Sequence, residues 1–316
     1  MSKKQPALIT LTGNPALDIT ISVDEVQPHH THRLSGAARK LGGKGINVST
    51  VAAEQGYETV ILGPLSEPDY IDCLRRDILP TNVNGKITLA FSDTHTPLRS
   101  TFAIHTRKDN NTSIFNEAGE AHDPEVYDSI LERLRKALKD HPRSVVTVSG
   151  SFAPQCPEDF LGKVVELTHD LGGRIIVDTA GEPLRRACAL QVDVVKPNID
   201  ELAETTGTAD ISQGAHALMN LGAKTVVVSA GPDGLYYFGP DGACHAKLPR
   251  QLDGNPTGAG DAAVSALGTA MIDSLSFEET LVRAVAWSAA AVLMPLAGNI
   301  SPEWHNLATE VIVQSL

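Results

Sequence analysis

Residues 174–198, RIIVDTAGEPLRRACALQVDVVKPN, decide the fold class of this chain. Arg174–Val177 and Val192–Val195 are short runs rich in β-branched residues, and this composition is typical of strands that are buried on both faces. Glu182–Ala189 lies between them and has a helical pattern. The order strand, helix, strand predicts a βαβ unit, in which a crossover helix joins two parallel strands.

The same alternation continues on both sides of this unit, from about residue 124 onward. Ser144–Val148 and Thr225–Val228 are further candidate strands, and Pro157–Asp170 and Ile199–Leu221 are candidate helices or helix pairs. The pattern predicts an α/β protein with a doubly wound, mostly parallel sheet flanked by helices. Another helix should precede the first strand, because apolar residues mark one face of it at Val126, Ile130, Leu131, Leu134 and Leu138.

The amino-terminal third has a different organisation. A helix should begin near Gly45, but the strand candidates of this region lack a helix between each pair. We therefore expect a small accessory β-sheet, a lid built from segments within about residues 12–40 and 86–118 of a single domain that spans 1–316. One apolar face of such a sheet needs a cleft or a second subunit to cover it, so we expect the lid to close over a ligand and also to pair two subunits in a homodimer. The strand candidates are Ile19–Val23, Ile87–Phe91, Thr101–His105 and Thr112–Phe115.

Charge and apolar patterning exclude several classes of protein. The 316 residues include 26 Lys and Arg against 38 Asp and Glu, a net charge of −12, which argues against a nucleic-acid binder. The apolar stretch Ala7–Leu11 is too short for a secretory signal, and Ala284–Ala297 is well under the roughly 20 residues that span a bilayer. We expect no membrane association and a buried helix at Ala284–Ala297.

The cysteines favour a cytoplasmic location. No two of them have the C-x-x-C spacing of a redox or zinc motif, and they lie far apart in the sequence. A disulfide framework is therefore not expected, and a reducing compartment suits the chain. The four cysteines are Cys73, Cys156, Cys188 and Cys244.

Polar or glycine-rich residues follow each predicted strand of the carboxyl-terminal part. Ser149–Ser151, Asp178–Gly181, Lys196–Asn198 and Ser229–Gly231 all come directly after apolar runs. Ligands of open parallel sheets bind outside the carboxyl ends of the strands, often at helix amino termini. One such turn is ordinary, but four in succession predict a binding crevice.

The sharpest candidate is Asn255–Asp261, NPTGAGD, which precedes the small-residue helix Ala262–Leu267. Its glycines allow a tight turn, and amide N–H groups at a helix amino terminus can hold an anion. Asp261 at this terminus has two interpretations. It could complement the helix dipole, or it could take the proton of an attacking hydroxyl while the amides stabilise a transferring phosphoryl group.

Other phosphate and metal motifs do not fit. Gly42–Gly45, GGKG, lacks the order of a Walker A motif, and no G-x-G-x-x-G follows a first strand. His29, His30 and His32 have no H-E-x-x-H helix or partner cysteines, so they are expected in a solvated loop. Glu201 is a better candidate for contact with magnesium, acting through the waters of the ion.

Two further motifs, NPALD at Asn14–Asp18 and GGKGINV at Gly42–Val48, join these segments in a recognisable order. The sequence resembles the PfkB, or ribokinase-like, carbohydrate kinases, and within them the phosphosugar branch of 1-phosphofructokinase and tagatose-6-phosphate kinase. The resemblance is collinear over nearly the whole chain, and GGKGIN and NPTGAGD are specific together. It implies a ribokinase-like doubly wound sheet with a small β lid that closes over a sugar.

The resemblance also implies roles for individual residues. Asp261 would be the catalytic base, with Gly258, Ala259 and Gly260 as the anion hole. Substrate would be held by Asp18, Gly42, Gly43, Asn47 and Ser149, with Arg33, Lys44 and Arg99 around an existing phosphate of the sugar. ATP would be bound by Lys196, Asn198, Ser229, Gly231 and Gly234, and Mg²⁺ would lie near Glu201 and Asn198.

The sequence departs from the family pattern at two places. Ala153–Pro154 is shifted from the position at which the family has proline after S-G-S. Leu296–Asn299 stands where the family has a Gly/Asn-rich adenine loop.

The leading hypothesis is an ATP-dependent kinase of a ketohexose monophosphate, with 1-phosphofructokinase ranked slightly ahead of tagatose-6-phosphate kinase. Asn255–Pro256 looks more like the tagatose version, and side-chain types alone leave the sugar open. A kinase of an unphosphorylated sugar or nucleoside is an alternative that gives no reason for three converging cations. A non-catalytic sugar-phosphate sensor is another alternative, although the retained Asp261 argues against it.

Overall fold

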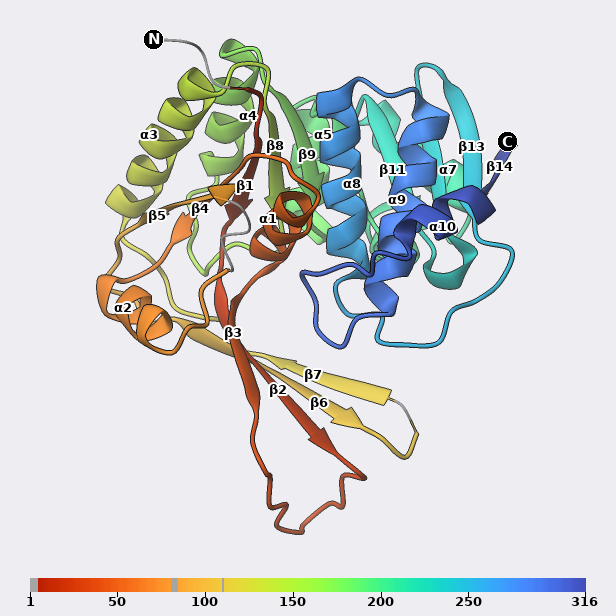
Figure 1. Cartoon of the computed structure of the whole chain (residues 1–316). Helices are drawn as coiled ribbons and strands as arrows, with labels where there is room; N and C mark the ends of the chain where they lie inside the picture. The colour runs from red at the N-terminus through yellow and green to blue at the C-terminus, as the bar shows by residue number, and fades with distance from the viewer. Residues whose placement is uncertain (1–4, 81–84, 110) are drawn as a thin grey trace.

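A computed structural model describes residues 5–80, 85–109 and 111–316 of the chain. Their strands form a large sheet in the order β14-β13-β12-β11-β10-β9-β8-β1-β4-β5 and a smaller sheet in the order β3-β2-β6-β7 (Figure 1). The large sheet consists of β1 (Leu8–Thr12), β4 (Thr59–Pro64), β5 (Ile87–Ser92), β8 (Val145–Ser149), β9 (Arg174–Asp178), β10 (Val194–Val195), β11 (Thr225–Ser229), β12 (Leu235–Gly239), β13 (Gly242–Lys247) and β14 (Ile312–Ser315).

The large sheet is mostly parallel, as the βαβ pattern predicts. From β5 to β11 every neighbouring pair is parallel, and only β12, β13 and β14 pair antiparallel at one edge. The four strands predicted from the carboxyl-terminal part correspond to β8 to β11. The strands β1 and β4 were not predicted, because their short apolar runs are not flanked by a regular βαβ alternation.

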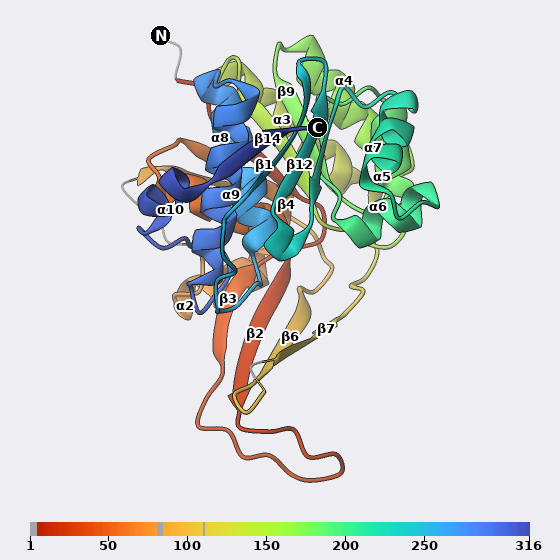
Figure 2. The same cartoon turned by 90° about the vertical axis from the view of Figure 1, so that its right-hand side faces the viewer.

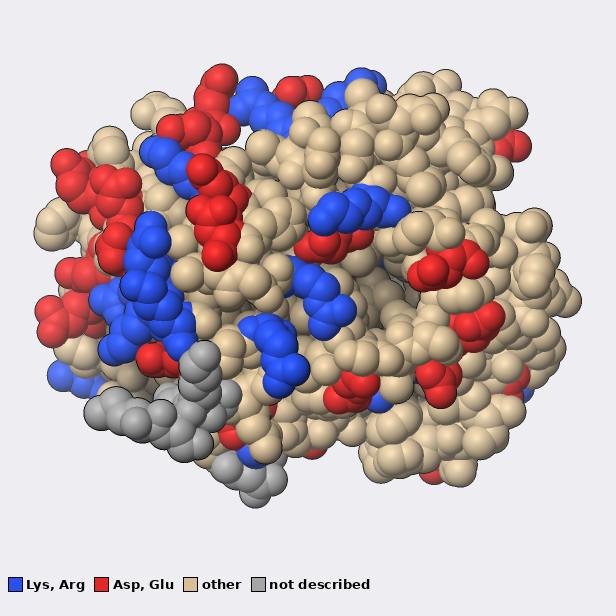
Figure 3. All heavy atoms as spheres, turned by 90° about the horizontal axis from the view of Figure 1, so that it is seen from above, with Lys and Arg blue, Asp and Glu red and all other residues tan. Residues whose placement is uncertain are grey.

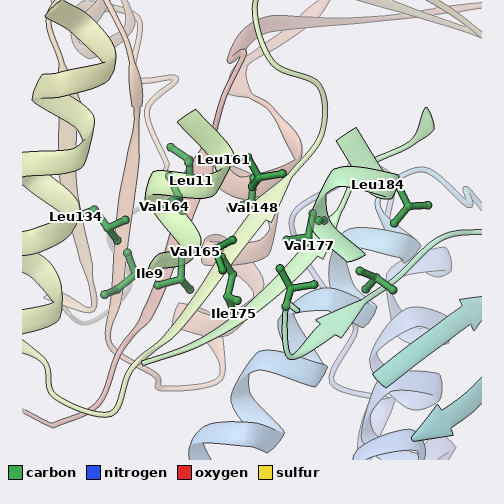
Figure 4. Packing of buried hydrophobic residues seen from close by; sticks show 14 of the residues in the cluster. Ile9, Leu11, Leu134, Val148, Leu161, Val164, Val165, Ile175, Val177 and Leu184 are labelled. Carbon is green, nitrogen blue, oxygen red and sulfur yellow. The ribbon is translucent and has the colours of Figure 1, made fainter. Parts of the chain in front are cut away.

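Helices cover both faces of this sheet (Figures 1 and 2). One core packs α3, α4, α5 and α7 against the sheet, and the other packs α1, α8 and α9 against the opposite face. Figure 4 shows the first core, in which Ile9 and Val148 of the sheet lie among Leu134, Val164 and other helix side chains. The helices are α1 (Lys44–Glu54), α2 (Glu67–Arg75), α3 (Pro124–Asp140), α4 (Phe160–Asp170), α5 (Gly181–Ala189), α6 (Ile199–Thr206), α7 (Ile211–Asn220), α8 (Ala259–Asp273), α9 (Phe277–Val292) and α10 (Trp304–Glu310).

Alternate side chains of β1 point to opposite faces of the sheet, so Ile9 and Leu11 belong to one core and Leu8 belongs to the other. Both faces of β1 are buried, and its two threonines are buried as well, with the Thr10 hydroxyl hydrogen-bonded to that of Ser49 at 2.8 Å. The predicted helix at Ile199–Leu221 is a pair, because Gly207 ends α6 in the left-handed conformation with φ 76°. The buried helix expected at Ala284–Ala297 is the last part of α9, which ends at Val292.

The smaller sheet is the lid. It consists of β2 (Ala16–Val23), β3 (Ala38–Gly42), β6 (Arg99–Thr106) and β7 (Asn111–Asn116), and it projects beyond the carboxyl ends of the large sheet (Figure 1). One strand assignment was wrong: Ile87–Phe91 belongs to β5, which pairs with β4 in the large sheet, so the second lid segment starts at Arg99. A strand pattern predicts extended backbone but not the sheet that it joins.

On the face seen from above, basic side chains are interspersed with acidic ones (Figure 3). Within the described part of the chain, every helix is too short or too polar to cross a membrane.

Candidate active site

The lid and the carboxyl ends of the strands enclose a cleft of about 1390 Å³. Lid side chains such as Thr101, His105 and Thr112 line one side of it, and the strand ends Ser149 and Asp178 line the other. The crevice predicted from the polar strand ends is therefore present. Sixteen residues predicted for the site line it: Asp18, Gly43, Lys44, Asn47, Arg99, Ser149, Lys196, Asn198, Glu201, Ser229, Gly231, Gly234, Gly258, Ala259, Gly260 and Asp261.

The NPTGAGD segment opens α8 at the floor of this cleft. Gly258 is the N-cap residue and has the left-handed φ of 89°, and the helix begins at Ala259. The Ala259 N–H donates to the Pro256 carbonyl at 3.1 Å, so this amide is already used. The first amides of a helix have no partner within the helix, which leaves those of Gly260 and Asp261 as the donors suited to an anion.

Asp261 lies in the first turn of α8 and is only 6% exposed. The Asn47 Nδ2 donates to its Oδ2 at 2.7 Å. Burial raises the pKa of Asp261 to about 6, against the opposing effects of Lys44, the Asn47 hydrogen bond and Lys196. A carboxyl with a pKa near the working pH, at the floor of a cleft, is suited to general-base chemistry.

A second buried carboxylate, Asp178 at the end of β9, holds two lysines. Its Oδ1 lies 3.1 Å from Lys196 Nζ, and its Oδ2 lies 3.3 Å from Lys44 Nζ. Burial alone would raise the pKa of Asp178, but the two ammonium groups hold it below its ordinary value. An added Cβ on Gly260 would lie 3.8 Å from Lys196 Nζ, so this cation adjoins the start of α8. The arrangement places positive charge where a phosphoryl group could approach Asp261.

Lys44 lines the cleft and its ammonium pairs with Asp178. The resemblance implies that it lies beside an existing phosphate of the sugar together with Arg33 and Arg99. The Asp178 charge raises the pKa of Lys44. Lys44 is the first residue of α1. Its side chain extends toward the strand ends, where the ammonium pairs with the buried carboxylate of Asp178.

Arg33 is not brought to the cleft within one chain. It lies on the exposed segment 24–37 between β2 and β3, at the end of the lid farthest from the large sheet (Figure 1). The expected clamp of three cations is therefore not assembled by a single chain. The histidine cluster of the same segment is exposed, as the sequence predicts for His29, His30 and His32.

Arg99 of β6 and Asp18 of β2 form the lid side of the cleft. The Arg99 guanidinium donates to the Asn14 carbonyl from Nε at 3.1 Å and from Nη2 at 2.9 Å, and to the Glu117 carbonyl at 2.8 Å. Burial raises the pKa of Asp18, and the charges of Lys40 and Arg99 oppose this effect. Gly42 does not line the cleft but lies behind Asp18, whose carboxylate occupies the space that a Cβ would need.

The opposite side of the cleft contains Asn198 and Glu201, which cap α6 reciprocally. Glu201 N donates to Asn198 Oδ1 at 2.8 Å, and Asn198 N donates to Glu201 Oε2 at 2.9 Å. This capping box fixes both oxygen-bearing side chains at the edge of the cleft. Gly231 has φ 55° and open space around it, whereas Gly234 is required by its packing against Ala246.

Two residues, one lining the cleft and one behind it, have no role predicted from the sequence. Asp178 was noted only as one of several polar residues that follow strands. The signal that could have identified it is a charged residue directly after the apolar run Ile175–Val177. Lys40 was not singled out, although it immediately precedes Leu41 and GGKGIN. Its Nζ donates to Asn47 Oδ1 at 2.9 Å and to the Ala297 carbonyl at 2.5 Å.

The late segment Leu296–Asn299 does not line the cleft. A Cβ on Gly258 would lie 2.6 Å from the Ala297 Cβ, and one on Gly298 would lie 3.0 Å from Asn47 Oδ1. These residues therefore pack behind the NPTGAGD turn. The apolar wall of the cleft comes instead from Leu248, Leu252, Val285 and Val292, from α9 and the segment before the turn.

The comparisons with known proteins agree with this geometry. The model of the pfkB family carbohydrate kinases matches residues 11–304. The chain is 33% identical to a 1-phosphofructokinase of Xanthomonas campestris pv. campestris, covering 96% of this chain and 97% of that protein. Its fold is similar to phosphofructokinase-2 from Escherichia coli in complex with fructose-6-phosphate, with 24% identity, a TM-score of 0.82 and 96% and 99% of the two chains covered.

A ribokinase from Arabidopsis thaliana, complexed with ribose and ATP, is also similar in fold. It has 21% identity and a TM-score of 0.74, with 96% of this chain and 99% of that chain covered. The large sheet with its small lid is therefore an arrangement shared with ribokinase-like kinases.

Proposed function

Because the chain belongs to the pfkB family of carbohydrate kinases, we propose that it transfers the γ-phosphate of ATP to a hydroxyl of a ketohexose monophosphate, with fructose 1-phosphate as the preferred sugar. The observation that carries the proposal is the buried Asp261 at the start of α8, with a pKa raised to about 6 and two lysines beside it. The 33% identical relative named 1-phosphofructokinase supports the choice of sugar.

In this mechanism Asp261 accepts the proton of the attacking sugar hydroxyl. The transferring phosphoryl group carries spread negative charge, which the amides of Gly260 and Asp261 and the ammonium of Lys196 stabilise. Lys44, held by Asp178, supplies a second cation on the path between the two substrates. Catalysis of this kind depends on positioning and charge, both of which a rigid helix terminus provides.

The two substrates would occupy opposite ends of the cleft. The sugar would lie under the lid, against Asp18 and Arg99, with Gly43 allowing close approach of the backbone. ATP would lie along Asn198, Ser229 and Gly231. Its base would rest on the apolar wall of Leu248, Leu252, Val285 and Val292, because an aromatic base needs an apolar surface and Leu296–Asn299 lies elsewhere.

Magnesium would enter with the nucleotide. Mg²⁺ keeps several waters and binds through one or two carboxylates together with substrate phosphates. Glu201 and Asn198 are oxygen donors of this kind at the edge of the cleft, and one Glu201 oxygen is used in the capping box. The residues therefore fit an ion shared with ATP, and among those described no cluster of His, Cys, Asp and Glu forms a separate metal cage.

A coupled ADP-release assay tests the proposal. With Mg²⁺ we expect the highest kcat/KM on fructose 1-phosphate, lower values on tagatose 6-phosphate, and loss of turnover when the metal is chelated. Arg99→Ala should raise KM for the phosphosugar about 10-fold or more, because a charge-assisted contact contributes about 1.5–3 kcal/mol. KM for ATP should change little.

Arg107→Ala is the matched control, since Arg107 is an exposed lid arginine that pairs with Asp24 outside the cleft. It should leave both KM values unchanged. Equal activity on unphosphorylated fructose would contradict the phosphate contact, and sugar-phosphate binding without any ADP release would support the sensor alternative.

We also propose that the lid pairs two subunits. Phe115 of β7 is 58% exposed, and it faces away from the cleft because its strand neighbour Ile114 lines the cleft. An exposed aromatic side chain on a four-stranded sheet without covering helices favours a partner surface. Light scattering at micromolar concentration should give about twice the chain mass of 33.5 kDa. A mass equal to that of one chain would contradict the proposed dimer. It would have no bearing on the contact between the lid and the cleft.

A cytoplasmic location is the remaining part of the proposal. All four cysteines are free, and Cys73, Cys188 and Cys244 are buried. Unpaired buried thiols suit a reducing compartment. This argument rests on the state of the four cysteines and does not depend on the kinase chemistry.

A further inference from the structure

We infer that Lys40, on lid strand β3, is a positioning residue that orients the Asp261 carboxylate through Asn47 and couples the closed lid to the catalytic helix α8. The inference rests on the proposed role of Asp261 as the base. Lys40 itself does not line the cleft, so any effect it has on the reaction must pass through other side chains.

The first step is a chain of two hydrogen bonds. Lys40 Nζ donates to Asn47 Oδ1 at 2.9 Å, and Asn47 Nδ2 donates to Asp261 Oδ2 at 2.7 Å. A carboxamide has one end that accepts and one that donates, and an ammonium can only donate. Lys40 therefore reinforces the amide orientation in which the NH₂ group faces Asp261. The opposite orientation would direct the NH₂ group at the ammonium and place an oxygen against the carboxylate.

The second step is the other contact of the same ammonium. Lys40 Nζ donates to the Ala297 carbonyl at 2.5 Å, and Ala297 packs directly on Gly258, the N-cap residue of α8. One charged group thus joins β3, α1 and the segment after α9. Both hydrogen bonds of Lys40 lead to the start of the helix that carries Asp261.

The third step links this group to the lid. Lys40 is the register partner of Asp18 across the β2–β3 pair, and β2 pairs in turn with β6, which begins at Arg99. Burial lowers the pKa of Lys40, while the charges of Asp18 and Asp261 oppose this effect and favour the ammonium form. A movement of the lid that carries β3 away from α1 would withdraw the cation from Asn47.

The consequence for pH follows from the groups that face Asp261. They are Lys44 and Asn47 on α1, Asp178 at the end of β9, Lys196 after β10, and Lys40 on β3. The base must be ionised to act, so activity should fall as the pH falls through about 6, the pKa of Asp261. Loss of Lys40 removes a positive charge and frees the Asn47 amide, and both changes raise that pKa.

The experiment is a pH profile of kcat for Lys40→Met, which keeps the length of the side chain without its charge. We expect kcat at pH 7 to fall about 10-fold and the acidic limb to move up by about half to one pH unit. KM for ATP should be unchanged. Lys40→Arg, which retains a charged donor, should return the limb toward its wild-type position.

Arg39→Met is the matched control, because Arg39 is the exposed neighbour on the same strand and its side chain donates to the Ala37 carbonyl, away from Asn47. The acidic limb of the kcat pH profile of Arg39→Met should stay at its wild-type position. In an Asn47→Ala background, Lys40→Met should add little, since the two residues act in series. The inference is overturned if the acidic limb of the Lys40→Met profile stays at its wild-type position. It is also overturned if Lys40→Met lowers kcat in the Asn47→Ala background as much as it does in the wild type.

Folding and the proposed function are checked separately. Circular dichroism and ATP binding show whether Lys40→Met is folded, and if it is not, Lys40→Arg and Lys40→Gln provide the comparison of a charged with a neutral donor. If Asp261→Asn remains fully active, the base itself is wrongly assigned. If Asp261→Asn is inactive and the limb of the Lys40 variants is unmoved, only the role of Lys40 fails.

Discussion

Asp261→Asn should lower kcat by about 10²–10⁴, the contribution typical of a general base. The amide keeps the shape of the side chain but cannot accept the proton of the sugar hydroxyl. KM for ATP should be nearly unchanged, because the nucleotide is proposed to contact the opposite side of the cleft. Steady-state kinetics with the preferred phosphosugar measures both parameters.

The stability of the same variant separates loss of chemistry from loss of fold. The pKa of Asp261 is raised in the folded state to about 6 from 3.8, so its neutral form is favoured by folding and its ionised form is not. The associated stability is present at low pH and is lost as the pH rises through about 6. At pH 8, therefore, Asp261→Asn should have a Tm at least as high as the wild type.

Asp273→Asn is the matched control at the other end of α8. Asp273 Oδ2 lies 2.7 Å from Arg283 Nη1, far along the helix from the cleft. This variant should have a lower Tm and an ordinary kcat. Wild-type kcat in Asp261→Asn would show that the base is wrongly assigned.

Gly258→Ala should reduce kcat by about 10²–10³, a loss comparable to that of an anion-hole donor. Gly258 has φ 89°, and an added Cβ would lie 2.6 Å from the Ala297 Cβ and 2.8 Å from its Cα. The turn would have to shift, and the amides of Gly260 and Asp261 would move with it. The effect should appear in kcat on the phosphosugar more than in ATP binding.

Gly56→Ala is the matched control for this substitution. Gly56 has the same φ of 89°, but nothing lies within 4 Å of an added Cβ. Both variants carry the strain of a left-handed alanine, which costs stability of order 1 kcal/mol. Only Gly258→Ala should lose activity, and equal kcat values in the two variants would contradict the assigned anion hole.

The large sheet and the sequence motifs of the site were predictable because their determinants are local. A βαβ unit is specified by the change from apolar strand runs to helical periodicity, as in residues 174–198, and neighbouring units then stack in parallel. NPTGAGD specifies a turn and a helix start through its own glycines. The polar strand ends converge because parallel strands end at one edge of a sheet.

Which strand joins which sheet was decided by the tertiary structure. Ile87–Phe91 has the pattern of a lid strand, yet β5 completes the large sheet beside β4. An extended segment can pair with any open edge, so the choice depends on where the preceding chain places it. The same limit explains why β3, with its short and polar sequence, was not predicted as a lid strand.

The sequence by itself determined the doubly wound sheet and the position of Asp261 at a helix start, since each depends on residues close together in the chain. The lid needed the tertiary structure as well, because it pairs β2 with β6, two strands that lie far apart in the sequence. Only the tertiary structure decided the cation partners: Lys44 lies on Asp178, Arg33 lies at the far end of the lid, and Lys40 lies on Asn47. Long flexible cations reach whichever carboxylate or carbonyl the packing of distant elements leaves within range. That choice follows from strand register and burial, which no local pattern contains.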